Sequence, residues 1–128
     1  MRAAPVPTEH EEQQALAQWL DLVVGPRAWC HVPNGGARRK VEAARMTAIG
    51  VKPGVPDILI FRRPPLRPEA RGVAIELKRQ RGSRTTSAQE DWLRELRDAH
   101  GWVVCVARGW DAARQWLEGL GFGQRRAR

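Results

Sequence analysis

The chain has 128 residues, 42% of them hydrophobic and 28% charged, and its 22 Lys and Arg against 14 Asp and Glu give a net charge of +8. This length predicts one domain, and this composition excludes a collagen-like or wholly disordered chain. No stretch approaches the roughly 18 uninterrupted apolar residues of a membrane span, and the first residues lack an apolar signal core. We therefore expect a cytoplasmic protein that does not enter a membrane.

The apolar periodicity predicts alternating helices and short strands. Thr8 and Glu11 have the spacing of a capping box at the start of the first helix. In chain order we expect a helix over 9–24, a strand over 28–32, a helix over 37–49, strands over 57–61 and 72–78, a helix from Thr86 or Ser87 to 99, a strand over 102–107 and a helix over 111–117. This α-β-α-β-β-α-β-α order predicts an α/β (α+β) fold, with a small mixed sheet flanked by helices.

The two ends of the chain are expected to lie outside the packed domain. Residues 1–7 are predicted to be a flexible N-terminus, 8–120 the domain, and 121–128 a basic tail with the composition of a disordered segment. Cys30 and Cys105 both fall in apolar runs without a second thiol at metal spacing, which predicts buried free thiols.

The positive charge is concentrated in the middle of the chain. Residues 27–84 carry a net charge of +10, residues 1–26 carry −3 and residues 85–128 carry +1. Such an excess favours a polyanionic partner, either nucleic acid or an anionic membrane. Only three of the 22 basic residues are lysines, so a genomic preference for arginine is an equally consistent explanation of the charge alone.

Three ionisable residues interrupt the apolar strands. Asp57 opens one predicted strand, and Glu76 and Lys78 lie in the middle and at the end of the next. Side chains alternate along a strand, so Glu76 and Lys78 share a face, and strand pairing could bring Asp57 to it. Two converging carboxylates repel unless a cation lies between them, and Mg²⁺ or Mn²⁺ prefers oxygen ligands. The alternative is an exposed Glu76–Lys78 pair on an edge strand, with Asp57 as a turn residue.

These residues carry a resemblance to a known family. Pro56-Asp57 followed by Glu76-Leu77-Lys78 resembles the PD-(D/E)XK nuclease signature. Further segments are similar to the VRR-NUC branch of that superfamily, over roughly residues 8–119: Asn34-Gly35-Gly36-Ala37-Arg38, Gly50-Val51, Gly54-Val55, Ser87-Ala88-Gln89 and Gly101-Trp102-Val103-Val104. The resemblance implies a restriction-endonuclease-like fold with a mixed four-stranded sheet, and a metal-dependent phosphodiesterase activity on DNA.

The resemblance also implies a role for each motif residue. Asp57 and Glu76 would hold Mg²⁺ or Mn²⁺ together with the backbone carbonyl of Leu77. Lys78 would position the attacking water or stabilise the transition state. Gln89 would support the site by hydrogen bonding.

An acidic residue of the first helix completes a second metal site in that family. Glu9 and Glu12 share one helical stripe with Leu16 and Leu20, whereas Glu11 lies to one side. Glu9 is preferred here, and Glu12 is the reserve. Compensation of the helix dipole by acids in the first turn is the alternative for both, and for Glu11.

The basic middle segment gives a candidate DNA-binding surface. Eight residues flank the predicted active-site strands in sequence: Arg38, Arg39, Lys40, Arg62, Arg63, Arg79, Arg81 and Arg84. Phosphate contacts position a backbone but read no bases, which favours structure-selective or non-specific cleavage.

We therefore expect a DNA endonuclease acting on branched, flap or Holliday-junction-like DNA in replication, repair or recombination, similar to stand-alone bacterial or phage members of the family. A homodimer would place two sites for paired incisions, although no dimer interface is evident in the sequence. The alternative is a catalytically weak nucleic-acid-binding module, for example in phage packaging or replication, with a vestigial site.

Overall fold

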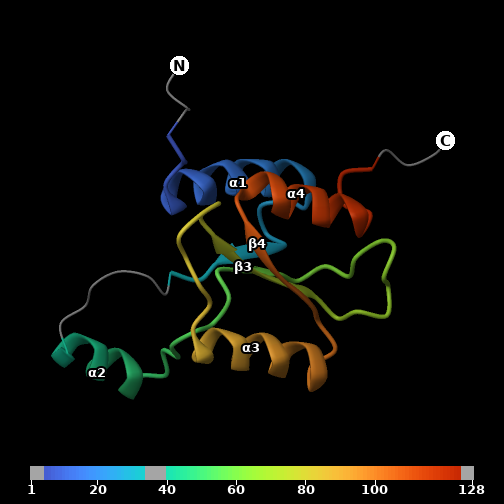
Figure 1. Cartoon of the computed structure of the whole chain (residues 1–128). Helices are drawn as coiled ribbons and strands as arrows, with labels where there is room; N and C mark the ends of the chain where they lie inside the picture. The colour runs from blue at the N-terminus through green and yellow to red at the C-terminus, as the bar shows by residue number, and fades with distance from the viewer. Residues whose placement is uncertain (1–4, 34–39, 125–128) are drawn as a thin grey trace.

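The computed structural model describes residues 5–33 and 40–124, and these form the predicted order of elements. The elements are α1 (Glu9–Val23), β1 (Trp29–His31), α2 (Lys40–Ala48), β2 (Ile58–Ile60), β3 (Val73–Lys78), α3 (Ser87–Asp98), β4 (Val103–Arg108) and α4 (Trp110–Gly119). Figure 1 shows α1 and α4 on one face of the sheet and α3 on the other. The fold is thus a mixed four-stranded sheet flanked by helices, as predicted.

The strand order is β1-β2-β3-β4, which places β3 in the interior of the sheet. β2 pairs antiparallel with both β1 and β3, whereas β4 pairs parallel with β3. Helices cover both faces of β3, and every one of its six residues is buried. Any polar side chain on β3 therefore lies inside the protein, where it needs a partner.

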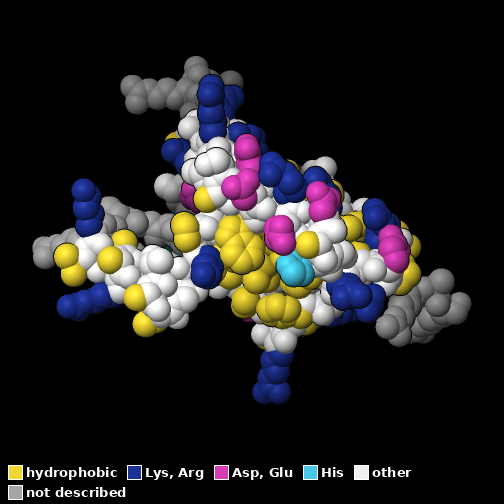
Figure 2. Space-filling view, turned by 90° about the horizontal axis from the view of Figure 1, so that it is seen from below, with side chains coloured by type: hydrophobic (Ala, Val, Ile, Leu, Met, Phe, Trp, Pro, Cys, Tyr) yellow, Lys and Arg dark blue, Asp and Glu magenta, His cyan; other side chains and the backbone are white. Residues whose placement is uncertain are grey.

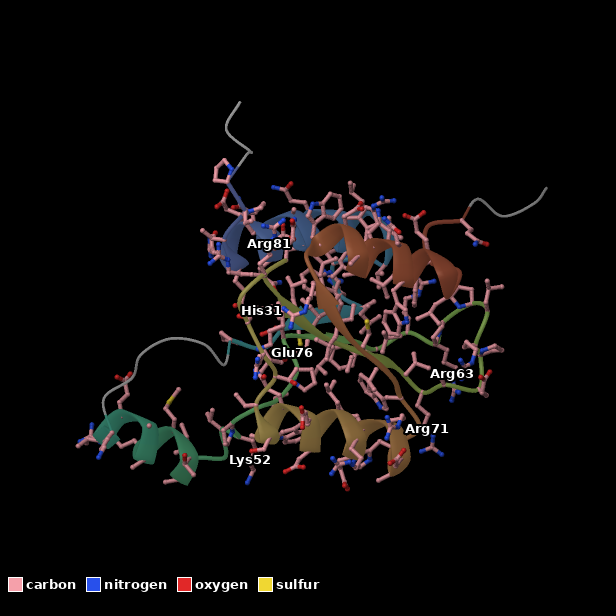
Figure 3. The ribbon with its side chains drawn as sticks, viewed as in Figure 1. His31, Lys52, Arg63, Arg71, Glu76 and Arg81 are labelled. Atoms are coloured by element: carbon pink, nitrogen blue, oxygen red, sulfur yellow. The ribbon has the colours of Figure 1, made fainter. Side chains whose placement is uncertain are left out.

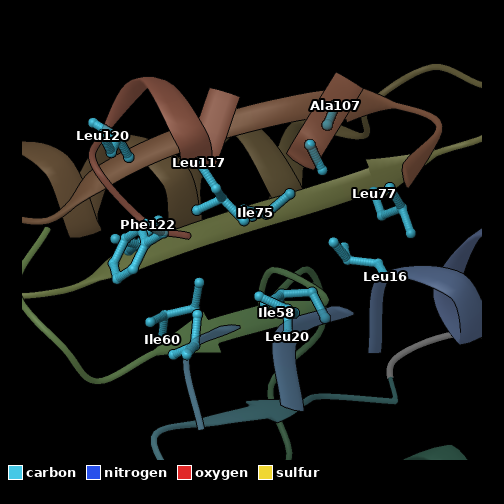
Figure 4. Close-up of a cluster of buried hydrophobic side chains, with 13 residues drawn as sticks. Leu16, Leu20, Ile58, Ile60, Ile75, Leu77, Ala107, Leu117, Leu120 and Phe122 are labelled. Atoms are coloured by element: carbon cyan, nitrogen blue, oxygen red, sulfur yellow. The ribbon is translucent and has the colours of Figure 1, made fainter. Parts of the chain in front are cut away.

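The hydrophobic core lies between the sheet and the α1–α4 layer. Leu16 and Leu20 of α1 and Leu117 of α4 are fully buried against Ile58 and Ile75 of the sheet (Figure 4). The capping box at Thr8 and Glu11 is present, so α1 begins at Glu9 as predicted. The packing of this layer therefore positions α1 and α4 against β3.

The predicted tail over 121–128 begins too early. Phe122 is 1% exposed and belongs to the core, and the guanidinium of Arg62 lies 5.6 Å from the centroid of its ring. The Gly and Arg around Phe122 conceal one large apolar side chain, whose burial continues the packed domain beyond residue 120. Residues 125–128 of that segment, and residues 1–4 of the predicted N-terminus, lie outside the described residues.

Cys30 and Cys105 are both free thiols, as predicted, but the prediction that both are buried is wrong for Cys30. Cys30 is exposed because it lies on β1, an edge strand, whereas Cys105 is half-buried and its burial raises the pKa of the thiol to about 11. Across the parts of the chain that are described, no helix is long and apolar enough to cross a membrane.

Helix α2 stands apart from the packed layers (Figure 1). None of its nine residues is buried. Val41 in the helix is 67% exposed, and Ile49, directly after the helix, is 77% exposed. Figure 2 shows hydrophobic side chains at the surface of the projecting part that contains α2. A short helix normally gains its stability by packing against the rest of the protein, and no residue of α2 is buried in this way.

Candidate active site

Strand register brings Asp57 beside Glu76. Ile58 is the register partner of Ile75, so the residue that precedes Ile58 falls next to the residue that follows Ile75. A carboxylate oxygen of Asp57, Oδ2, accepts a 2.8 Å hydrogen bond from the Leu77 N–H. The N–H and C=O of one strand residue point to the same side, so the Leu77 carbonyl faces the side on which Asp57 lies.

The backbone of Asp57 is also held. Its carbonyl oxygen accepts a 2.7 Å hydrogen bond from the Val32 N–H and lies 2.9 Å from Nδ1 of His31. Gly54, three residues earlier, has φ +84°, and a Cβ there would lie 2.6 Å from the carbonyl carbon of Ala88. The loop that delivers Asp57 therefore packs directly on the first turn of α3, which only a glycine permits.

Glu76 and Lys78 are buried, with exposed fractions of 2% and 7%. Lys78 Nζ lies 3.4 Å from Glu76 Oε1. The other carboxylate oxygen of Glu76, Oε2, is buried and has no hydrogen-bond partner among the described residues. The alternative of an exposed pair on an edge strand is therefore wrong, because β3 is an interior strand.

Gln89 connects the acid and the ammonium. Its Nε2 donates to Glu76 Oε1 at 2.9 Å, and its Oε1 accepts from Lys78 Nζ at 3.1 Å. The same Oε1 accepts from the Thr86 N–H at 2.8 Å, which completes the capping box of α3. One side chain thus fixes both the start of the helix and the orientation of Glu76 and Lys78 (Figure 3, where Glu76 is labelled).

Glu76 keeps its proton to a higher pH than a carboxyl group usually does, and the pKa of Asp57 is raised as well. Burial, followed by the charge of Asp57, raises the pKa of Glu76 to about 8 despite the nearby Lys78. Burial also raises the pKa of Asp57, although the Leu77 N–H opposes that shift. A divalent cation between the carboxylates would replace this proton and give Glu76 Oε2 the partner it lacks, so the residues present fit such an ion.

The structure does not bring an acid of α1 to this pair. Glu9, the preferred residue, is exposed, and Glu12 is the one that lies inward on the stripe of Leu16 and Leu20. The Glu12 carboxylate accepts from the Trp110 N–H and, at 3.3 Å, from Gln80 Nε2, so it caps α4. No cluster of three His, Cys, Asp or Glu suited to a metal occurs within residues 5–33 and 40–124. Glu9 as the third acid, with Glu12 as its reserve, therefore stays a prediction.

The predicted DNA-binding residues fall into separate groups. Arg79, Arg81 and Arg84 follow β3 directly, at the end of the sheet where Lys78 lies. Figure 3 shows Arg81 on the Glu76 side of the molecule and Arg63 on the opposite side.

The remaining members lie farther from the acidic pair or make other contacts. Arg62 donates to the Val24 carbonyl at 3.0 Å and Arg63 to the Pro68 carbonyl at 3.1 Å. Lys40 begins the projecting α2, and Arg38 and Arg39 lie outside the described residues.

Two neighbours of the site escaped the sequence reasoning. His31 contacts the Asp57 backbone, and only the register of β1 against β2 reveals this. The sequence reasoning also did not predict the packing of Gly54 against Ala88. The position of Gly54 in the Gly54-Val55-Pro56-Asp57 motif could have indicated it.

Comparisons with known proteins agree with this geometry. The model of the VRR-NUC domain family matches residues 7–111. A solved structure titled "VRR_NUC domain protein" superposes with a TM-score of 0.73 at 26% sequence identity, covering 91% of this chain and 90% of that one. A search of curated proteins gave no match. With the family match spanning most of the chain and the Asp57, Glu76 and Lys78 constellation assembled inside it, the protein belongs to the VRR-NUC domain family, a family of nuclease type.

Proposed function

We propose that the protein is a DNA endonuclease that depends on Mg²⁺ or Mn²⁺. The observation that carries this proposal is the buried Asp57–Glu76 pair, in which one carboxylate oxygen has no partner and both groups have a raised pKa. Asp57, Glu76 and the Leu77 carbonyl would hold the ion. When bound, the ion would supply charge stabilisation to the phosphoryl group and lower the pKa of a bound water.

Lys78 and Gln89 would serve the reaction from the other side of Glu76. Gln89 Oε1 holds Lys78 Nζ at 3.1 Å, which limits where the ammonium can move. A fixed ammonium in a dry site can orient a water molecule or stabilise the charge that develops on a phosphate. Gln89 is a positioning residue, because its contacts are with Glu76, Lys78 and the start of α3 rather than with the substrate.

The family implies DNA as the substrate, and the arginines after β3 support the same choice. Arg79, Arg81 and Arg84 lie at the active-site end, where phosphate contacts would hold a DNA strand without reading bases. We therefore propose selection by DNA structure, with branched, flap or four-way-junction DNA as substrates in replication, repair or recombination.

The test is cleavage of linear, flap and four-way-junction DNA with Mg²⁺, with Mn²⁺ and with EDTA. The variants are Asp57→Asn, Glu76→Gln and Lys78→Ala, and the control is Glu69→Gln, which neutralises an exposed carboxylate paired with Arg67. We expect the native protein and the control to cut only with metal, and the site variants to lose at least 10²-fold in rate, about 3 kcal/mol.

Two outcomes contradict the proposal. Cleavage that persists in EDTA contradicts the metal dependence, and cleavage that survives both Asp57→Asn and Lys78→Ala contradicts the assignment of the site. Binding of junctions without cleavage in either metal would instead support the accessory binding module.

We also propose that two copies of the chain associate through α2. The support is that no residue of the short helix α2 is buried, while Val41 and the adjoining Ile49 expose large apolar side chains. Light scattering on the purified protein should give a dimer mass, and Val41→Ser with Ile49→Ser should give a monomer. A native monomer at micromolar concentration would overturn this part of the proposal.

A further inference from the structure

A hollow lies between the loop that follows Lys78 and the end of β4. It has a volume of about 480 Å³, and its lining consists of Gln80, Arg81, Gly82, Ser83, Arg84 and Arg108. Arg108 ends β4 and is the register partner of Lys78. Neighbouring strands are about 4.8 Å apart, so this hollow, here called the Arg108 hollow, begins directly beside the active site.

The charge of the Arg108 hollow is unbalanced. Three arginines line it and no carboxylate does, whereas three other hollows in the described part of the chain each include a glutamate: Glu90, Glu69 and Glu42. Four arginines elsewhere are paired with acids: Arg67, Arg94, Arg97 and Arg114. Among the described residues, those of the Arg108 hollow form no ion pair, so their combined field favours an anion.

The guanidinium of Arg108 is held in place. One of its amino groups donates to the Ser83 carbonyl at 2.5 Å, and the other contacts the Arg79 carbonyl at 3.4 Å. Guanidinium has five N–H donors, so others remain for a ligand. Gly82 has a φ of +91°, which favours glycine at this point of the loop.

We propose that the Arg108 hollow binds a phosphate of the DNA strand adjacent to the phosphate that is cleaved. This proposal rests on the proposed function, because that function defines where the cleaved phosphate lies. The planar guanidinium matches two phosphate oxygens at once, and every nucleotide of a strand supplies a further phosphate beside the one near Lys78. The sequence predicted that Arg81 and Arg84 contact DNA phosphates. The hollow adds Arg108 to them and places the contact with the phosphate between the loop after β3 and the end of β4.

The first test measures DNA binding in EDTA, which separates it from cleavage. Arg108→Gln removes the charge but keeps a donor for the Ser83 carbonyl, and Arg94→Gln is the control because it makes the same charge change at an arginine paired with Asp91. We expect Arg108→Gln to bind an oligonucleotide roughly tenfold more weakly and to lower the salt slope by about one, with Arg94→Gln unchanged. Equal losses in the two variants, or no loss in either, would overturn the proposal.

The second test locates the phosphate. A neutral methylphosphonate is placed at one linkage at a time across a site that the protein cuts, and binding is measured with the native protein and with Arg108→Gln. We expect one linkage next to the cleaved bond to cost the native protein roughly tenfold and the variant nothing further. Profiles of the same shape for both proteins would overturn the assignment. If the native protein binds DNA and never cuts it, the proposed activity fails, while the binding test still decides whether the hollow takes a DNA phosphate.

Inorganic phosphate is the probe for the other source of the same chemistry. It is titrated alone into the native protein and into Arg108→Gln while thermal unfolding is followed. We expect little stabilisation of either protein, because a strand presents several phosphates together. Stabilisation of the native protein that matches the effect of the oligonucleotide and disappears in Arg108→Gln would assign the hollow to a free anion and overturn the DNA assignment.

Discussion

Replacement of Gly54 by alanine tests whether the loop before Asp57 must touch α3. The new Cβ would lie 2.6 Å from the carbonyl carbon of Ala88 and 2.8 Å from its carbonyl oxygen. Both atoms are backbone, so the contact can be relieved only by shifting α3 or the loop. We expect such a shift to disturb the bonds that Gln89, one residue after Ala88, makes to Glu76 and Lys78.

The size of the effect follows from two contributions. An alanine at the positive φ of Gly54 costs roughly 1–2 kcal/mol, and overpacking against a rigid neighbour adds roughly 1–3 kcal/mol. Gly50→Ala is the matched control, because Gly50 has φ +102° but nothing within 4 Å of a Cβ placed there. The control therefore carries the conformational cost without the steric one.

Urea denaturation and DNA cleavage provide the assay. We expect Gly54→Ala to lower the free energy of unfolding by roughly 2–5 kcal/mol and Gly50→Ala by roughly 1–2 kcal/mol. Under conditions in which both variants are folded, only Gly54→Ala should lose cleavage activity. Equal destabilisation by the two variants, or full activity in folded Gly54→Ala, would refute the reasoning about this contact.

Three further predictions concern Glu76, Gln89 and Glu12. The pKa of Glu76 is raised to about 8 in metal-free protein, so the folded state keeps a proton that the unfolded state loses near pH 4.5. Urea denaturation in EDTA should therefore show the free energy of unfolding falling as pH rises from 4.5 to 8, by at most about 5 kcal/mol. Glu76→Gln should flatten this dependence, and an unchanged slope in that variant would contradict it. Gln89→Ala should lower both the melting temperature and the cleavage rate. Thr86→Ala removes the same helix cap but spares the contacts of Gln89 with Glu76 and Lys78, so it should lower mainly the melting temperature. Equal losses of cleavage rate in the two variants would assign Gln89 to the cap alone. Glu12→Ala leaves the Trp110 N–H without its acceptor and should cost roughly 1–3 kcal/mol in chemical denaturation, against less than about 0.5 kcal/mol for the exposed Glu9→Ala.

The sequence predicted the order of the elements because the strongest local signals agree with the packing. The capping box at Thr8 and Glu11 and the Gly50 after α2 fall where the structure places them. Alternation along β3 predicted that Glu76 and Lys78 share a face, and the register of β2 against β3 places Asp57 beside Glu76. Phe122 was missed because a single apolar residue among glycines and arginines has no periodicity to mark it as part of the core.

The fine structure of the site depended on contacts between distant segments, which periodicity does not encode. The spacing of Glu9 and Glu12 placed both near one stripe, and only the packing of α1 against α4 shows that Glu12 faces inward and caps Trp110. The eight basic residues were grouped by sequence distance from the acidic strands. Arg62 and Arg63 do not lie beside the acidic pair. β2 and β3 are antiparallel, so the loop that connects them lies at the opposite end of the sheet from Glu76.

The site combines stability and chemistry in the same atoms, and this explains why its motifs occur together. Gln89 Oε1 closes the capping box of α3 and also holds Lys78, so the helix cannot begin in this way without orienting the ammonium. The Leu77 N–H both fixes Asp57 and sets the direction of the Leu77 carbonyl. Against these favourable contacts stands the buried Glu76 Oε2, which has no partner in the described structure, while burial and the charge of Asp57 raise the pKa of that carboxyl to about 8. A buried acid pair without an ion costs stability in neutral solution, and a divalent cation would reduce that cost, so the interactions that position the residues would also favour the binding of such an ion.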